Sequence, residues 1–237
     1  MVDSLIGIDT DVFLWLNSMH NPFWDIFMKI ATGRFIWIGL YLSIIYALWR
    51  AYGWKGMLVV FCLCCLAVAC ADQITASLLR PYFERLRPAN LDNPISMMVH
   101  VVDGYRGGRF GFPSSHAANT FAVATMLSLV FRRSRFTIAI FAWALLNCYS
   151  RIYLGLHYPG DLIVGIFIGL FCGLILYFVA LLVRAYLVGD DKWGMNDPAL
   201  SAFILGRKIS YRAVDVVIAV ELLTVCAIFL CEVSLLF

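Results

Sequence analysis

Residues 162–187 read LIVGIFIGLFCGLILYFVALLVRAYL, an apolar run that contains a single charge, Arg184. A helix that crosses a bilayer needs about 20 consecutive, mostly apolar residues, so this run is long enough to cross one. The composition agrees, because 62% of the 237 residues are hydrophobic and only 14% are charged. Soluble domains carry about 25% charged residues. The excess of apolar surface predicts an integral membrane protein.

Five further apolar runs extend this prediction to about six membrane-spanning helices in an all-α, polytopic helical bundle. They are Phe35–Trp49, Met57–Leu79, Ala117–Phe131, Phe136–Tyr149 and Val214–Phe237. Ahead of them, residues 1–33 alternate large apolar side chains with Asp, Asn and His. That segment predicts two short amphipathic helices at the membrane interface, with a shallow seventh span as the alternative.

The chain shows no linker between its apolar runs, which predicts a single membrane-embedded domain over residues 1–237. The net charge of +3 is too small to indicate nucleic acid, and no obligatory protein partner is evident. The eight cysteines lie in or beside apolar runs, where small buried hydrophobes are expected rather than a metal site.

Positive charge predicts the orientation. Ten of the eighteen Lys and Arg fall in loops on one side of the predicted topology: Arg50, Lys55, Arg132, Arg133, Arg135, Arg184, Lys192, Arg207, Lys208 and Arg212. The positive-inside rule makes that side cytoplasmic. Residues 80–113 and 150–161 are then expected on the outer side.

Three polar clusters occupy this outer side: Arg80–Pro88, Phe112–His116 and Ser150–Asp161. Charges at the ends of membrane helices are costly unless they are paired or functional. Arginine forks match phosphate oxygens, and Ser114 and Ser115 are candidate N-caps of a helix whose free N–H groups attract an anion. The clusters therefore predict a phosphate site.

Two histidines offer reactive groups at this site. His157 and Asp161 are four residues apart, so Asp161 can accept a bond from one ring nitrogen and leave the other nitrogen free to attack. His116 is a candidate general acid for the departing oxygen. This set suits phosphoryl transfer, in which positioning and charge neutralisation dominate catalysis.

The order and spacing of the clusters resemble the signature of the type 2 phosphatidic acid phosphatase (PAP2) superfamily. That signature is Lys-x6-Arg-Pro, then Pro-Ser-Gly-His, then Ser-Arg-x5-His-x3-Asp. This chain reads Arg80-x6-Arg87-Pro88, Pro113-Ser114-Ser115-His116 and Ser150-Arg151-x5-His157-x3-Asp161. Arginine replaces the usual lysine at position 80, and serine replaces the usual glycine at position 115.

The resemblance implies a phosphate cradle. Arg80, Arg87 and Arg151 would bind the phosphate, and Ser114 with the backbone near Ser115 would complete the cradle. Serine at position 115 is costly only if the backbone there needs a positive φ.

The resemblance also implies the catalytic roles. His157 would be the nucleophile, Asp161 its orienting partner and His116 the acid for the leaving group, after which water would hydrolyse the phosphohistidine. No metal and no other cofactor is expected.

The substrate implied is a membrane lipid phosphate in the bilayer of a bacterial inner membrane, with the site facing the periplasm. Undecaprenyl diphosphate is slightly favoured, followed by lipid A phosphate, with phosphatidylglycerol phosphate and phosphatidic acid as further options. A lipid-to-lipid phosphotransferase would carry the same motifs. A non-enzymatic transporter of anionic lipid would explain the arginines but not the spacing of His157 and Asp161.

Overall fold

The computed structural model describes residues 2–33, 35–189 and 209–236, and within these the regular elements are all helical. The main helices are α1 (Val2–Asn17), α2 (Pro22–Ala31), α3 (Ile38–Asp72), α4 (Arg80–Phe83), α5 (Ser115–Phe131), α6 (Ser134–Tyr153), α7 (Pro159–Gly189) and α9 (Tyr211–Leu236). A π-helical stretch, Gln73–Leu79, joins α3 to α4. Three short 3-10 helices complete the set: Phe35–Trp37, Ser96–Met98 and Val102–Gly104. The predicted all-α class is confirmed.

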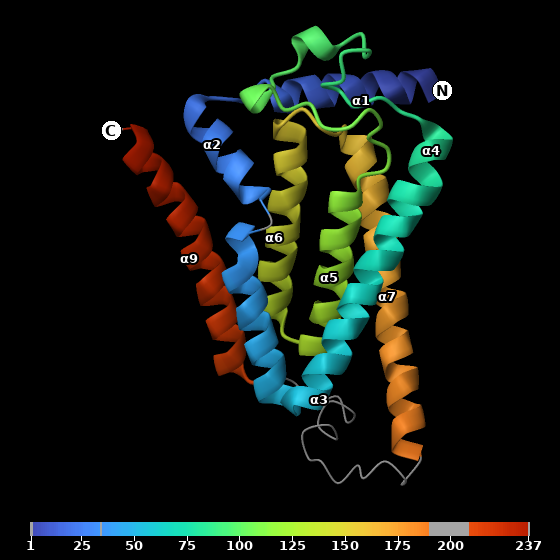
Figure 1. Ribbon diagram of the computed structural model, residues 1–237, viewed down its shortest axis with the longest axis vertical. Coiled ribbons are helices and arrows are strands. Elements are labelled where there is room, and N and C mark those ends of the chain that lie inside the picture. Colours follow the sequence, from blue (N-terminus) through green and yellow to red (C-terminus); the bar gives the residue numbers. More distant parts are fainter. Residues whose placement is uncertain (1, 34, 190–208, 237) are drawn as a thin grey trace.

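Four helical segments are long and apolar enough to cross a membrane: Phe35–Phe83, Ser134–Tyr153, Pro159–Leu182 and Tyr211–Cys231. The first turns back on itself at Gly53, where φ is 65° and ψ is −179°, so it contributes two arms (Figure 1). Glycine adopts this backbone conformation without a steric penalty. With the shorter apolar helix α5, the bundle therefore contains the predicted six apolar segments, although the predicted end at Phe237 lies outside the described residues.

Helices α5 and α7 approach each other closely because small residues line the contact. A Cβ atom added at Gly165 would lie 2.5 Å from the carbonyl oxygen of Ser114, and one added at Gly169 would lie 2.4 Å from that of Ala118. Gly173 makes the same kind of contact one turn further along. Such close packing of small residues is a main source of helix association in lipid. It holds the first turns of the two helices together.

Helix α1 lies across one end of the bundle, and α2 descends from it alongside α9 and α6 (Figure 1). The buried Asn17 fastens the end of α1, since its amide donates to the carbonyl of Tyr153 at 2.9 Å and its Oδ1 accepts from the backbone of His100 at 2.8 Å. The two predicted N-terminal helices are confirmed as helices. Their placement at a membrane interface stays a prediction.

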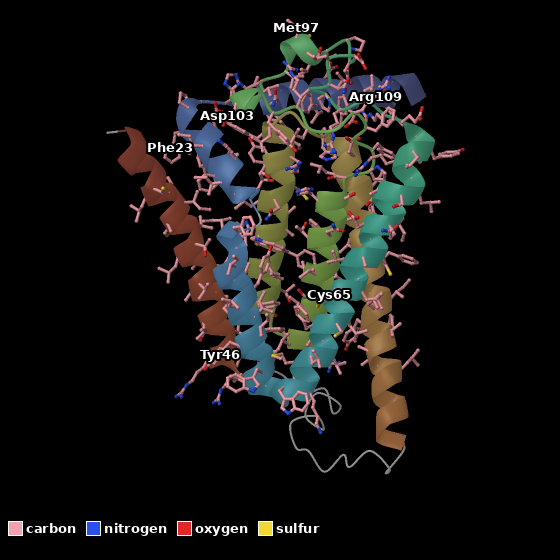
Figure 2. The ribbon with its side chains drawn as sticks, in the orientation of Figure 1. Phe23, Tyr46, Cys65, Met97, Asp103 and Arg109 are labelled. Atoms are coloured by element: carbon pink, nitrogen blue, oxygen red, sulfur yellow. The ribbon has the colours of Figure 1, made fainter. Side chains whose placement is uncertain are left out.

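The long loop between α4 and α5 covers the same end of the bundle as α1. Figure 2 shows Met97, Asp103 and Arg109 at this end and Tyr46 at the other. The turn at Gly53 and the short α5–α6 connection lie at the end away from α1 (Figure 1). Several residues of the predicted cytoplasmic set flank these two turns: Arg50, Lys55, Arg132, Arg133 and Arg135. Lys192, Arg207 and Lys208 of that set lie outside the described residues.

Candidate active site

The connection between α6 and α7 is a tight loop that places His157 inside the protein. The carbonyl of Arg151 accepts from the backbone N–H groups of both Leu156 and His157, at 2.9 and 3.3 Å. Gly155 has a φ of +74°, and a Cβ there would lie 2.7 Å from a methyl group of Val99. This folding leaves the His157 side chain 1% exposed.

His157 lies between the carboxylate of Asp161 and the guanidinium of Arg87. Its Nδ1 lies 3.4 Å from Oδ2 of Asp161, and its Nε2 lies 2.9 Å from Nη1 of Arg87. A guanidinium group can only donate, so Nε2 must be the acceptor and the ring proton must sit on Nδ1, facing Asp161. The geometry thus selects the neutral tautomer with a lone pair on Nε2.

The electrostatics keep this imidazole neutral. Burial, followed by the charges of Arg87, Arg151 and Arg80, holds the pKa of His157 well below its usual range. Burial and the nearby charge of Arg80 also lower the pKa of Arg87. A neutral imidazole with an available nitrogen lone pair is the form that attacks phosphorus.

Three arginines converge here from different elements. Arg80 donates to Ser115 Oγ at 2.8 Å, Arg151 donates to Thr32 Oγ1 at 2.9 Å, and Arg87 also donates to a backbone carbonyl, that of residue 156, at 2.9 Å.

Each of these arginines keeps an unused donor. Among the described groups, the buried Nε atoms of Arg80, Arg87 and Arg151 have no hydrogen-bond partner. An unsatisfied buried donor costs about 1–3 kcal/mol. Three such donors beside a neutral imidazole form a site suited to an oxyanion such as phosphate.

The two serines occupy the start of α5. Ser114 is the predicted N-cap, because its Oγ accepts from the backbone of Ala117 at 3.5 Å, and its own N–H donates to the carbonyl of Asp161 at 3.0 Å. Ser115 is not among the residues with positive φ, so serine at this glycine position carries no backbone strain. Phosphate binding by these serines stays a prediction.

His116 follows in the first turn of α5, and its side chain is exposed, in contrast to the buried His157. An exposed imidazole is suited to serve a leaving group that projects outward. The role of His116 as an acid stays a prediction.

Two residues of this region were not identified as site residues from the sequence. Arg85 donates to Asp161 Oδ1 at 2.8 Å and to Asp9 Oδ2 at 2.7 Å. Each of these contacts joins residues 76 apart in the chain, a separation at which no periodicity rule applies. Gly111 was missed as well: a Cβ there would lie 3.1 Å from Cγ of Arg87 and 3.2 Å from Oδ2 of Asp161.

The PAP2 superfamily profile matches residues 56–184. A lipid A 4′-phosphatase of Bacteroides thetaiotaomicron is 42% identical over 230 residues, which is 97% of each chain. A lipid A 4′-phosphatase of Porphyromonas gingivalis is 32% identical over 199 residues, covering 84% of this chain and 81% of the relative.

Among solved structures, the crystal structure of Aquifex aeolicus LpxE aligns with a TM-score of 0.55 and 25% identity, covering 70% of this chain and 93% of that chain. The profile match contains all three polar clusters and more than half of the chain. By its motifs, its helical bundle and its relatives, the chain belongs to the PAP2 superfamily.

Proposed function

We propose that this lipid phosphatase removes the 4′-phosphate of lipid A at the periplasmic face of the inner membrane, through a phosphohistidine. The observation that best supports this proposal is a set of three buried arginine Nε donors without hydrogen-bond partners, in the same cluster as the Nε2 lone pair of His157. The choice of lipid rests on the two lipid A 4′-phosphatases, whose matches cover 97% and 84% of this chain. This moves lipid A phosphate ahead of undecaprenyl diphosphate.

In the first step, the phosphate ester enters the arginine cluster, and Arg87 turns its donors from His157 to a phosphate oxygen. The freed Nε2 attacks phosphorus, so that a P–N bond forms while the P–O bond to the lipid breaks. His116 gives its proton to the departing lipid oxygen. Asp161 stabilises the positive charge that develops on the ring of His157.

In the second step, a water molecule gives a proton to His116 and its oxygen attacks the phosphorus. A new P–O bond forms, the P–N bond breaks, and inorganic phosphate leaves. His157 returns to its neutral form, and His116 regains the proton that it lost in the first step. The arginines neutralise the transferring group throughout, which is the main requirement of phosphoryl transfer.

The test is a panel of pure lipids in detergent with the purified full chain: lipid A with both phosphates, undecaprenyl diphosphate, phosphatidylglycerol phosphate and phosphatidic acid. Free phosphate is measured with and without EDTA, and tandem mass spectrometry locates the phosphate lost from lipid A. We expect loss of the 4′-phosphate, insensitive to EDTA because guanidinium groups supply the positive charge. Faster release from another lipid overturns the substrate, and phosphate found only on a second lipid indicates a phosphotransferase.

The orientation is tested separately. A cysteine at position 97, on the long loop, is introduced into a chain whose own cysteines are replaced, and intact cells are treated with a membrane-impermeant maleimide. Met97 is 87% exposed, so labelling is expected if the loop faces the periplasm. Labelling only after the inner membrane is opened would place the site on the cytoplasmic side.

A further inference from the structure

We propose that Asp9 and Arg85 are positioning residues, which fix the carboxylate of Asp161 and, through it, the ring of His157. The N-terminal helix α1, which carries Asp9, then contributes a positioning residue to the active site rather than only anchoring the protein to the membrane. The inference rests on the proposed function, since it concerns the same reaction.

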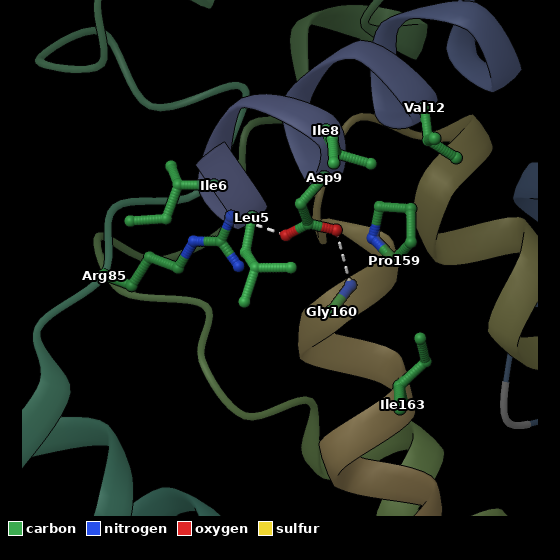
Figure 3. A pocket seen from close by; sticks show the side chains of 9 residues that line it. All are labelled: Leu5, Ile6, Ile8, Asp9, Val12, Arg85, Pro159, Gly160 and Ile163. Atoms are coloured by element: carbon green, nitrogen blue, oxygen red, sulfur yellow. Dashed lines mark hydrogen bonds and ion pairs between the residues drawn. The ribbon is translucent and has the colours of Figure 1, made fainter. Parts of the chain in front are cut away.

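The contacts form one continuous chain. Arg85 uses one Nη for Asp161 Oδ1, at 2.8 Å, and the other for Asp9 Oδ2, at 2.7 Å. The remaining oxygen of Asp9 accepts the N–H of Gly160, in the first turn of α7, at 2.7 Å. Figure 3 shows the carboxylate of Asp9 between the guanidinium of Arg85 and Gly160. The helix that carries Asp161 is thus tied to α1 by the backbone as well as by the ion pair.

Burial makes the tie to Arg85 necessary. The side chain of Asp161 is 0% exposed, and a buried carboxylate needs a counter-charge and hydrogen bonds. Its Oδ2 accepts from the backbone of Tyr158 at 3.0 Å and faces His157, which leaves Oδ1 to Arg85. Without Arg85 the carboxylate would lose its charged partner, and only the bond from the Tyr158 backbone would fix its orientation.

The surroundings hold the guanidinium of Arg85 still. Its central carbon lies 3.9 Å from the ring centre of Tyr158, a cation–π stack. An apolar groove of about 400 Å³ lies beside the pair (Figure 3). Aliphatic side chains of α1 and α7 line this groove: Leu5, Ile6, Ile8, Val12 and Ile163. Because these side chains are aliphatic, they offer the guanidinium of Arg85 no hydrogen-bond acceptor on the side of the groove.

The arrangement predicts which kinetic constant changes. In the described contacts, Arg85 and Asp9 do not touch the three phosphate-binding arginines. Removal of either partner should therefore lower kcat and leave KM nearly unchanged. Side chains that orient a functional residue through hydrogen bonds typically change activity about 10- to 100-fold when they are replaced. We therefore expect kcat to fall by about 10- to 100-fold in Arg85→Gln or Asp9→Asn.

The two variants should shift the titration of His157 in opposite directions. The other charges acting on His157, those of Arg87, Arg151, Arg80 and Asp161, stay in place. Arg85→Gln removes a cation from the contacts behind the ring, so the pKa of His157 should rise. Asp9→Asn removes an anion and leaves Arg85 to Asp161 alone, so that pKa should fall. A purely structural role predicts no such opposition.

The experiment combines kinetics with a readout that does not need turnover. Full-length protein labelled with ¹⁵N-histidine is titrated in detergent, and its four histidines make the spectrum assignable by single substitutions. The variants are Arg85→Gln, Asp9→Asn, their combination, and Arg85→Lys as the conservative rescue. The controls are Asp11→Asn on the exposed part of α1 and Arg109→Gln, whose side chain is 65% exposed.

The expected result is opposite shifts for the two single variants, a double variant no slower than Arg85→Gln, and partial recovery with Arg85→Lys. Unchanged His157 titration, with kinetics like those of the controls, overturns the inference. If none of the lipids in the panel is hydrolysed while the opposite shifts persist, the proposed function fails and the positioning role stands.

Discussion

Nη1 of Arg87 lies 2.9 Å from Nε2 of His157. The contact covers the lone pair of His157 with a guanidinium group, which binds phosphate more strongly than it binds imidazole. In the proposed mechanism, arrival of the phosphate would draw Arg87 away and uncover this lone pair. Binding of the substrate and activation of the proposed nucleophile would then be linked through Arg87.

Replacing His157 should remove turnover and the covalent intermediate together. We expect His157→Gln to lower kcat by at least about 10⁴-fold, because glutamine has no nitrogen lone pair that could form the proposed P–N bond. Rapid quenching in alkali with a ³²P-labelled substrate should trap phosphoprotein in the native chain and none in the variant. His20→Gln is the control, since His20 stacks on His100 and lies outside the three clusters. A trapped phosphoprotein in His157→Gln would refute the assignment.

Replacing Arg151 with lysine should weaken binding even though the charge is kept. Lysine lacks the planar fork of arginine, so the variant would lose either the contact that Nη1 of Arg151 makes with Thr32 or the contact with phosphate that we propose for its unpaired Nε. We expect kcat/KM to fall about 10²-fold, with a clear rise in KM. Arg109→Lys, at an exposed ion pair with Asp92, should behave like the native chain. Equal values of kcat/KM and KM for Arg151→Lys and Arg109→Lys would contradict a phosphate-binding role for Arg151.

The pH dependence of kcat/KM reports the free enzyme. The proposed attack needs a neutral His157, whose pKa is held well below its usual range, so its protonation should not lower kcat/KM until the pH is well below that range. Arg87→Gln removes the leading charge that lowers this pKa, so its acid limb should move to higher pH.

The substrate phosphate titrates near pH 6, but it does so equally with both enzymes. The difference between the native and Arg87→Gln profiles, measured between about pH 5 and pH 8, therefore reports the groups of the enzyme that lie beside Arg87, among them His157. Superimposable acid limbs would show that Arg87 does not control its protonation.

Gly111 should tolerate no side chain. A Cβ there would press on Arg87 and Asp161 at 3.1 and 3.2 Å, whereas one at Gly108 would meet nothing within 4 Å. We expect Gly111→Ala to lower kcat at least 10-fold and to destabilise the fold by roughly 1–3 kcal/mol, as overpacking does. Gly108→Ala should match the native chain in activity and in thermal unfolding. Native activity in Gly111→Ala would mean that the site relaxes around the added methyl group.

Much of the fold follows from local pattern. The six apolar runs and the two N-terminal helices are readable because a membrane span is a matter of length and composition along one segment. Gly53, where the chain reverses direction, lies between the first two predicted apolar runs, and the structure joins these two runs in one bent helical segment. The glycine spacing at 165, 169 and 173 is also visible in the sequence, but its meaning depends on which helix lies opposite.

The motif residues were likewise predictable, because the order and spacing of the three clusters are properties of the sequence itself. The sequence by itself determined an all-α membrane bundle and a set of arginine, serine and histidine residues, the proposed phosphate site, on one side of it. Only the tertiary structure decided that Thr32 supports Arg151, across 119 residues, and that Asp9 reaches Asp161 through Arg85. Periodicity relates positions within one helix, whereas these contacts depend on how separate helices cross and which rotamers their side chains adopt.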